Sequence, residues 1–205
     1  MSYSSFTNEK LKEKFGVEQT LQRGIFSNLP KRKPSAWLLE TLSKTRDFAL
    51  SQGSEKARSE YIIAPVFYEL REQSEQKVSI FSGRKFDIDK KLNLDGYCDF
   101  LVSRSPSQVI LESPVVIAVE AKQDKFEKGT TQCIAEMIAA RIFNEKKGNP
   151  QKQIYGCVTT GVGWLFLFLE NNKAFVDTTI FDVTEDLERI LGILWAMSFG
   201  EIDIK

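Results

Sequence analysis

A carboxylate and an ammonium group stand two positions apart at the end of an apolar stretch, in the segment VVIAVEAKQDK (residues 115–125). Five apolar residues precede Glu120, and only Ala121 separates it from Lys122. Because the side chains of a strand alternate between its two faces, Glu120 and Lys122 project to the same face. Buried charges are costly unless they pair, bind a metal or reach water. The two residues therefore form either a strand-end ion pair or part of a cation-dependent site.

The spacing Glu-x-Lys alone carries no information, since it recurs at residues 75–77 and 145–147. Those two copies lie in polar surroundings. Only the copy at 120–122 follows a continuous apolar run of the kind that predicts a strand buried on both faces.

A second carboxylate, Asp99, lies within the apolar segment DGYCDFLVS (residues 95–103). The connection over residues 104–114 predicts that the strands on its two sides form an antiparallel hairpin centred near residue 109. In that hairpin Asp99 and Glu120 are cross-strand neighbours, with Cβ atoms roughly 5 Å apart when directly opposed. Two facing carboxylates repel each other unless they share a cation, and oxygen ligands favour Mg²⁺ or Mn²⁺.

The composition excludes several other kinds of site. The chain has 0 histidines, which excludes His-based triads, His-dependent nucleases and His-rich zinc sites. Its 3 cysteines (Cys98, Cys133 and Cys157) have no C-x-x-C spacing, which indicates reduced thiols in a core and predicts a cytoplasmic location. The N-terminus has no apolar signal segment and no apolar run approaches a membrane span, so no membrane association is expected.

Hydrophobic periodicity and turn signals predict the elements that must position these residues. The expected helices cover residues 7–15, 36–52, 55–73, 129–147 and 184–200, with Ser35 introducing the second, Ser54 capping the third, Thr130 or Thr131 capping the fourth and Thr184 capping the fifth. Pro65 is expected to kink the third helix. The expected strands cover residues 77–88, 94–103, 114–122, 153–161, 163–170 and 173–182.

This order of elements predicts a mixed α/β sandwich around a central sheet, in which the helix over 129–147 makes the crossover. The length of 205 residues and the 42% hydrophobic content fit one compact unit. Within it, residues 1–53 are expected to form an N-terminal helical extension packed on a core formed by residues 54–205.

The ordered set of candidate residues resembles the PD-(D/E)XK nuclease superfamily. The matching positions are Asp99, Glu120-Ala121-Lys122 at the end of an apolar strand, Glu60 on the preceding helix, and Gln132 on the following one. Cys98, rather than a proline, precedes Asp99. The resemblance covers about residues 55–170 and extends to the nuclease domain of type I restriction subunits, with a later hairpin like Thr159 to Trp164, and to uncharacterised bacterial proteins, cyanobacterial ones among them. It implies a restriction-endonuclease-like three-layer core, a mixed central sheet flanked by helices, with extra N-terminal helices.

The resemblance also implies hydrolysis of phosphodiester bonds with Mg²⁺ or Mn²⁺ as cofactor. Asp99, Glu120 and the backbone carbonyl of Ala121 would ligate the cation. Lys122 would orient or deprotonate the attacking water, or stabilise the developing charge.

Two helical residues complete the implied site. Glu60 would contact the cation through water, or is an early-turn acid that the helix dipole favours. Gln132 would hydrogen-bond Lys122 or a phosphate, or is an ordinary exposed residue.

The charge balance bears on the expected partner. Lys plus Arg and Asp plus Glu number 28 each, for a net charge of +0, whereas strong sequence-independent nucleic-acid binders usually carry a basic excess. The resemblance implies a nucleic-acid partner, DNA before RNA, with a homodimer or a separate protein supplying targeting. The neutral balance favours an alternative, a catalytically silent fold that acts as a binding or assembly module. A third hypothesis is an enzyme that acts on a different phosphodiester.

Overall fold

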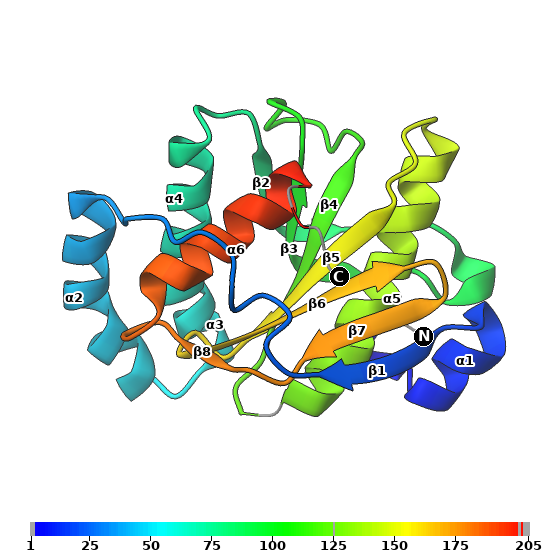
Figure 1. Cartoon of the computed structure of the whole chain (residues 1–205), viewed down its shortest axis with the longest axis horizontal. Coiled ribbons are helices and arrows are strands. Elements are labelled where there is room, and N and C mark those ends of the chain that lie inside the picture. Colours follow the sequence, from blue (N-terminus) through cyan, green and yellow to red (C-terminus); the bar gives the residue numbers. More distant parts are fainter. Residues whose placement is uncertain (1–2, 125, 201, 203–205) are drawn as a thin grey trace.

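The computed structural model describes residues 3–124, 126–200 and 202, and its centre is an 8-stranded mixed sheet (Figure 1). The strand order is β1-β7-β6-β5-β4-β3-β2, and β8 pairs with β6 beside this path. The pairs β1–β7 and β4–β5 are parallel and the others are antiparallel. The strands are β1 (Glu18–Gln22), β2 (Ser79–Lys85), β3 (Tyr97–Ser103), β4 (Val115–Ala121), β5 (Gln153–Thr159), β6 (Gly163–Glu170), β7 (Lys173–Asp177) and β8 (Phe181–Asp182).

Helices cover both faces of this sheet and create two hydrophobic cores. The helical elements are η1 (Tyr3–Ser5), α1 (Asn8–Phe15), α2 (Ala36–Ser51), α3 (Glu55–Arg58), η2 (Ser59–Ile63), α4 (Ala64–Gln73), η3 (Lys90–Leu92), α5 (Phe126–Lys146) and α6 (Leu187–Phe199). One core joins α2, α4 and α6 to the sheet, and the other joins η1, α1 and α5 to it. None of the helices in the described part of the chain is long and apolar enough to cross a membrane.

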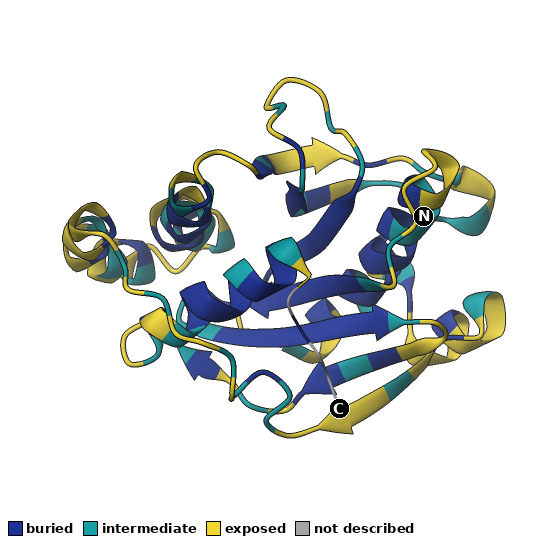
Figure 2. Ribbon diagram, turned by 45° about the horizontal axis from the view of Figure 1, so that its top comes forward, coloured by how far each residue is buried: buried dark blue, intermediate teal, exposed yellow. Residues whose placement is uncertain are grey.

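The middle of the sheet is enclosed by these layers (Figure 2). All residues of β4 are buried, as the continuous apolar run predicted. The three cysteines are free and buried, also as predicted. The mixed α/β class expected from the order of elements is therefore confirmed.

The crossover between β4 and β5 is formed by α5, as expected for two parallel neighbours. Gly156 of β5 allows this helix to approach closely, since a Cβ atom there would lie 2.6 Å from Met137 Sδ and 2.8 Å from Cys133 Sγ. The crossover places the first turns of α5 beside the end of β4, where Glu120 and Lys122 lie.

The start of α5 differs from the prediction. The helix begins at Phe126, so Thr130 and Thr131 lie inside it and are not its caps. Their hydroxyl groups donate to preceding carbonyls instead, Thr130 Oγ1 to Phe126 O at 2.8 Å and Thr131 Oγ1 to Lys128 O at 3.1 Å. The first turn, formed by Phe126, Glu127 and Lys128, contains no serine, threonine, asparagine or aspartate, so a search for cap residues does not find it.

The N-terminal region also differs from the prediction of a purely helical extension. Residues 18–22, which lie outside every expected helix and strand, form β1 and pair in parallel with β7 at the edge of the sheet. Only Gln19 of its five residues is even partly covered, so β1 lacks the alternating burial that identifies a strand in sequence. Its pairing partner lies at residues 173–177, and only the folded chain brings the two together.

The helix predicted over 55–73 is interrupted at η2, a π-helical turn that precedes Pro65. Proline cannot donate to the carbonyl of Tyr61. The hydroxyl of Thr45, on α2, donates to that carbonyl at 2.7 Å instead. The wider turn shifts the phase of the helix, so Ala57 and Ile62 are buried while Glu60 is exposed. Both predicted N-terminal serines act as caps, Ser35 towards Leu38 N at 3.2 Å and Ser54 towards Ala57 N at 3.1 Å.

Candidate functional site

Asp99 and Glu120 lie opposite each other where β3 and β4 meet at one end of their ladder. The register pairs Phe100 with Val119, so the next step opposes Asp99 and Glu120, in agreement with a hairpin centred near residue 109. Asp99 Oδ2 accepts a hydrogen bond of 2.8 Å from the backbone N–H of Ala121. The structure thus brings the first two predicted residues together.

Lys122 follows directly at the end of β4 and forms an ion pair with the Glu120 carboxylate. Its backbone N–H donates to Thr159 O at 2.8 Å, which anchors it to the neighbouring strand β5. The lysine side chain is 23% exposed and the glutamate side chain 3%, so the pair meets solvent only on the lysine side. The prediction that both side chains lie on one face is confirmed.

The electrostatic environment disfavours the negatively charged form of both Asp99 and Glu120. Burial and the nearby charge of Asp99 raise the pKa of Glu120 to about 7, against the opposing effect of Lys122. Burial also raises the pKa of Asp99, and the Ala121 N–H and Lys122 only partly offset it. Burial lowers the pKa of Lys122, but the carboxylates of Glu120, Glu55 and Asp99 together outweigh burial, so the net shift is upward.

A further carboxyl group, Glu136 on α5, reaches the same place. Glu136 is 0% exposed, and its carboxyl group makes side-chain contact with that of Glu120. Gln132 Nε2 donates to Glu136 Oε1 at 3.1 Å. Burial and the charge of Glu120 raise the pKa of Glu136 well above its usual range. Gln132, which was predicted to bond Lys122 or a phosphate, is partly buried and bonds this acid instead.

The sequence did contain a signal for Glu136. It is a single acid within the apolar stretch CIAEMIAA of α5, the same kind of signal that identified Asp99. A helix buried along most of its length hides that signal, because such a helix has no polar face against which an inward acid stands out.

Glu60, the predicted helical acid, is not at this place. Its side chain is 51% exposed and forms an ion pair of 2.7 Å with Lys56. The expectation that Glu60 faces inward from one turn before Ile63 is wrong, because both residues lie in the π-helical turn η2, where Ile63 is buried and Glu60 is exposed.

Glu55, at the start of α3, is the acid of this helical region that approaches the site. Burial raises its pKa and the charge of Asp99 adds to that effect, while Lys122 and the backbone N–H of Gln123 oppose it. Arg58, one turn further along, donates from Nη1 to the carbonyls of Gln123 at 2.8 Å and Thr160 at 3.2 Å. These bonds hold α3 against the segment that follows β4.

A glycine on α5 makes room for the lysine. A Cβ atom at Gly129 would lie 3.0 Å from Lys122 Cγ and 2.6 Å from Val158 Cγ1. Any side chain at this position would displace Lys122 or separate α5 from β5. Gly129 therefore sets how closely the helix approaches the site.

A pocket of about 720 Å³ opens beside the lysine. Lys122 and Gln132 line it from the sheet and α5, and residues 4–9 of the N-terminal segment form the opposite wall. Tyr3, just before that wall, is buried and lies within electrostatic reach of Glu136. The N-terminal segment is therefore part of the surroundings of the site.

The donor set fits a hard divalent cation, although the side chains are not arranged as a finished cage. Glu120 Oε2 and Glu136 Oε2 are buried without a hydrogen-bond partner. Three carboxyl groups, those of Glu55, Asp99 and Glu120, interact electrostatically with Lys122. A fourth, that of Glu136, interacts with Glu120 and Asp99. Within residues 3–124, 126–200 and 202, no group of three His, Cys, Asp or Glu side chains is already spaced to hold a metal ion.

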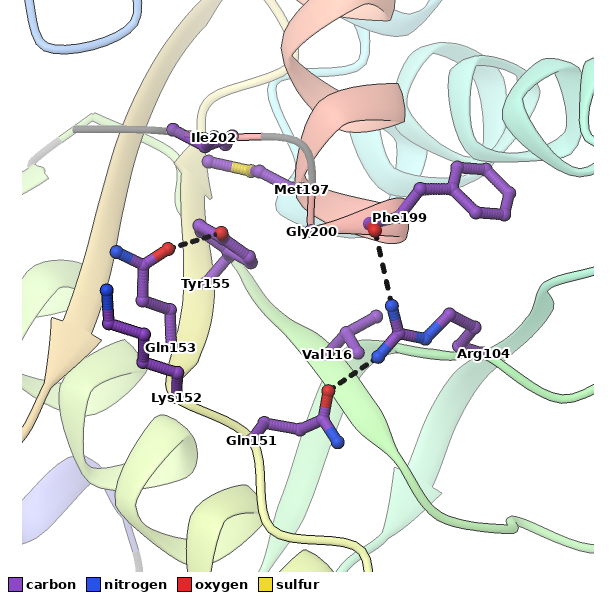
Figure 3. Close-up of a pocket in the computed structure, with 10 residues that line it drawn as sticks. All are labelled: Arg104, Val116, Gln151, Lys152, Gln153, Tyr155, Met197, Phe199, Gly200 and Ile202. Carbon is purple, nitrogen blue, oxygen red and sulfur yellow. Dashed lines mark hydrogen bonds between the residues drawn. The ribbon is translucent and has the colours of Figure 1, made fainter.

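A second pocket, of about 520 Å³, lies on the α6 side of the sheet (Figure 3). Arg104 crosses it and donates to Phe199 O at 3.3 Å and to Gln151 Oε1 at 2.5 Å. Val116, at the opposite end of β4 from Glu120, also lines it. This pocket is therefore separate from the acids.

The structure thus brings together four of the predicted residues, Asp99, Glu120, Lys122 and Gln132. It adds Glu55 and Glu136 to this group. Glu60 lies outside it. Comparisons with protein-family models, with curated proteins and with solved structures found no match for this chain.

Proposed function

We propose that this chain is a metal-dependent nuclease of the restriction-endonuclease-like, PD-(D/E)XK type, hydrolysing phosphodiester bonds of DNA with Mg²⁺ or Mn²⁺. The observation that carries the proposal is the set of two opposed carboxylates and one lysine at the end of the buried strand β4. Two elevated carboxyl pKa values beside each other mark a place that gains from a cation. The mixed sheet covered on both faces is compatible with this type of fold.

Asp99 and Glu120 would hold the cation, with the backbone carbonyl of Ala121 as a further oxygen ligand. A bound divalent cation supplies charge neutralisation and a water of lowered pKa for attack on phosphorus. Glu120 keeps an unpartnered oxygen available for this role, and Asp99 is oriented by the Ala121 N–H. Glu55 replaces Glu60 as the helical acid in this proposal, acting through water.

Lys122 would orient the attacking water and stabilise the charge that develops on the phosphate. Because the carboxylates raise its pKa, Lys122 is an ammonium at neutral pH, which favours these two roles over proton abstraction. Its ion pair with Glu120 would loosen when a cation takes its place on the carboxylate. Gln132 would act indirectly, by orienting Glu136.

The test combines cation binding with cleavage. The full chain is incubated with linear, supercoiled and single-stranded DNA and with RNA, in Mg²⁺, in Mn²⁺ and in EDTA. We expect slow cleavage that requires the cation and is abolished in Lys122→Ala, while the exposed control Lys44→Ala cuts like the wild type. Asp99→Asn should weaken Mn²⁺ binding in calorimetry yet leave the cation-free protein as stable or slightly more stable, because one repelling charge is removed.

The competing hypothesis is a catalytically silent binding or assembly module, favoured by the net charge of +0. It predicts negligible Mn²⁺ heats for both the wild type and Asp99→Asn. It also predicts lower stability for Asp99→Asn, since Lys122 would lose an electrostatic partner in a purely structural site. That pair of results would replace the nuclease proposal with the module.

A further inference from the structure

Arg104, directly after β3, is a partly buried cation without an acidic partner. Its guanidinium group donates to two neutral oxygens, from Nη1 to Phe199 O at 3.3 Å and from Nη2 to Gln151 Oε1 at 2.5 Å. In the described part of the chain, no carboxylate forms an ion pair with it. Three other arginines each pair with a neighbouring acid, namely Arg46, Arg71 and Arg189. The positive charge of Arg104 is therefore not neutralised by another side chain.

The bonds made by Arg104 fix its position and leave N–H donors over. Gln151 is itself held in place, because its Nε2 donates to the carbonyls of Asn149 and Pro150, both at 3.1 Å. Phe199 O lies at the C-terminal end of α6, where the helix dipole favours a cation. The guanidinium group has more N–H donors than these two bonds use. Arg104 is thus a cap of α6 and also a fixed donor for a further oxygen.

The pocket of about 520 Å³ around Arg104 is positively charged, since none of the described residues that line it is acidic (Figure 3). Lys152 and Tyr155 lie across the pocket from Arg104, and the Tyr155 hydroxyl donates to Gln153 Oε1 at 2.6 Å. Burial raises the pKa of Tyr155 to about 12, so this hydroxyl is uncharged at neutral pH. The Lys152 side chain is 86% exposed and pairs with Glu170 Oε1 at 3.2 Å, a surface pair that contributes little and exchanges readily for a ligand.

Apolar side chains form the rest of the pocket wall. Val116 comes from β4, Met197 from α6 and Ile202 from the chain after α6, and all three are buried. Phe199 completes the wall beside Arg104. Sites for small molecules have volumes of this size and combine apolar walls with a few polar groups. The pocket therefore fits a ligand with an apolar body and a negatively charged head.

We propose that this pocket binds a small organic anion, with its carboxylate or phosphate head on Arg104 and its apolar body against Val116, Met197 and Ile202. A planar guanidinium group matches both kinds of oxyanion, because it donates parallel hydrogen bonds to two oxygens. The pocket lies at the opposite end of β4 from Glu120, on the α6 side of the sheet. It is a separate site, and the inference does not rest on the proposed nuclease activity.

The test is calorimetric titration of the full chain with octanoate and with phenyl phosphate, each beside an uncharged counterpart, octanamide and benzyl alcohol. At least one anion should bind roughly tenfold or more tightly than its counterpart, as expected for a charge-assisted hydrogen bond. The tighter anion identifies the head as a carboxylate or a phosphate. Arg104→Gln should remove this preference, while the matched control Arg84→Gln, which replaces an exposed arginine of β2, should keep it.

A measurement on the unchanged chain covers the case in which Arg104→Gln fails to fold, since that change also removes the bond to Phe199 O. In an NMR titration, the bound anion should shift the backbone amide signals of Gln151 and Gly200, which line the pocket. The amide signals of Lys122 and Gln132, at the proposed nuclease site, should stay in place.

Two results would overturn the inference. Equal affinities for each anion and its uncharged counterpart would show an apolar pocket that does not select charge. Absence of shifts at Gln151 and Gly200 would show that Arg104 serves only as a cap of α6. Neither result bears on the nuclease proposal, and Asp99→Asn should bind the anion as the wild type does.

Discussion

The protonation of Glu120 is governed by opposing electrostatic effects from its surroundings. Burial and Asp99 disfavour its negative charge, while Lys122 favours it, and the result is a pKa of about 7. Asp99 and Glu136 are shifted in the same direction, and burial is the first cause in each case. Glu120 therefore changes its protonation state close to neutral pH. A bound cation would offset the repulsion between the carboxylates and hold them in their charged form.

The first expectation concerns the pH dependence of stability in EDTA. The folded pKa of Glu120 is about 7 against an ordinary value of 4.5, so the folded protein binds more protons than the unfolded chain between these limits. The stabilisation is complete below pH 4.5 and is lost as the pH rises through 7. Urea unfolding should therefore show a loss of about 2 kcal/mol between about pH 5.5 and 8.

Two controls identify the source of this pH effect. Glu120→Gln should flatten the profile, because it removes the group that titrates. Saturating Mn²⁺ should reverse the slope, since the cation binds the deprotonated carboxylates. A wild-type stability that rises steadily over this pH range in EDTA would contradict the shift.

At the scale of elements, a single irregular turn decides which acid serves the site. The π-helical turn η2 precedes Pro65, and Thr45 donates to the carbonyl that the proline leaves open. It moves Glu60 into solvent and leaves α3 to present Glu55, with Arg58 bonded to the backbone beside Lys122.

The corresponding prediction compares two glutamates five positions apart. Glu55→Gln should weaken Mn²⁺ binding roughly tenfold or more, as expected when a group that acts on a metal through water is removed. Glu60→Gln should leave the Mn²⁺ affinity unchanged and cost about 0.3–0.5 kcal/mol of stability, the size of an exposed helical ion pair with Lys56. Calorimetric titration of both variants measures this, and the opposite ranking would restore Glu60 to the site.

At the scale of the molecule, the N-terminal region belongs to the core and is not an appendage. It adds β1 to the sheet edge beside β7, and it packs η1 against α5 near Glu136. Tyr3 is 1% exposed, and its hydroxyl donates to the backbone carbonyl of Phe86, just after β2. The same segment walls the pocket that leads to Lys122.

Tyr3→Ala should therefore destabilise the whole protein by about 3–5 kcal/mol, the usual cost of removing a buried aromatic side chain. The matched control is Tyr97→Ala, whose side chain is 66% exposed and which should cost about 0.5 kcal/mol or less. Urea unfolding monitored by tryptophan fluorescence measures both. Equal effects for the two variants would show that the N-terminal segment is not part of the cooperative core.

The sequence by itself determined the features that depend on local periodicity. The period of two along a strand places Glu120 and Lys122 on one face, and the length of the connection at 104–114 opposes Asp99 to Glu120. Serine caps and apolar stripes likewise predicted α2, the start of α3 and the crossover by α5. These features are fixed by residues near one another in the chain, so a linear pattern reveals them.

Only the tertiary structure decided the features that depend on distant partners. β1 forms because β7, far along the chain, offers a free edge to an otherwise exposed segment. Within η2, the Tyr61 carbonyl accepts a hydrogen bond from Thr45 of another helix. Glu60, in the same turn, is exposed, and Glu55 is the acid that approaches the site. Glu136 joins the site because Gly129 and Gly156 let α5 pack closely on β5 beside the end of β4. In each case the deciding energy comes from a contact that no local pattern encodes.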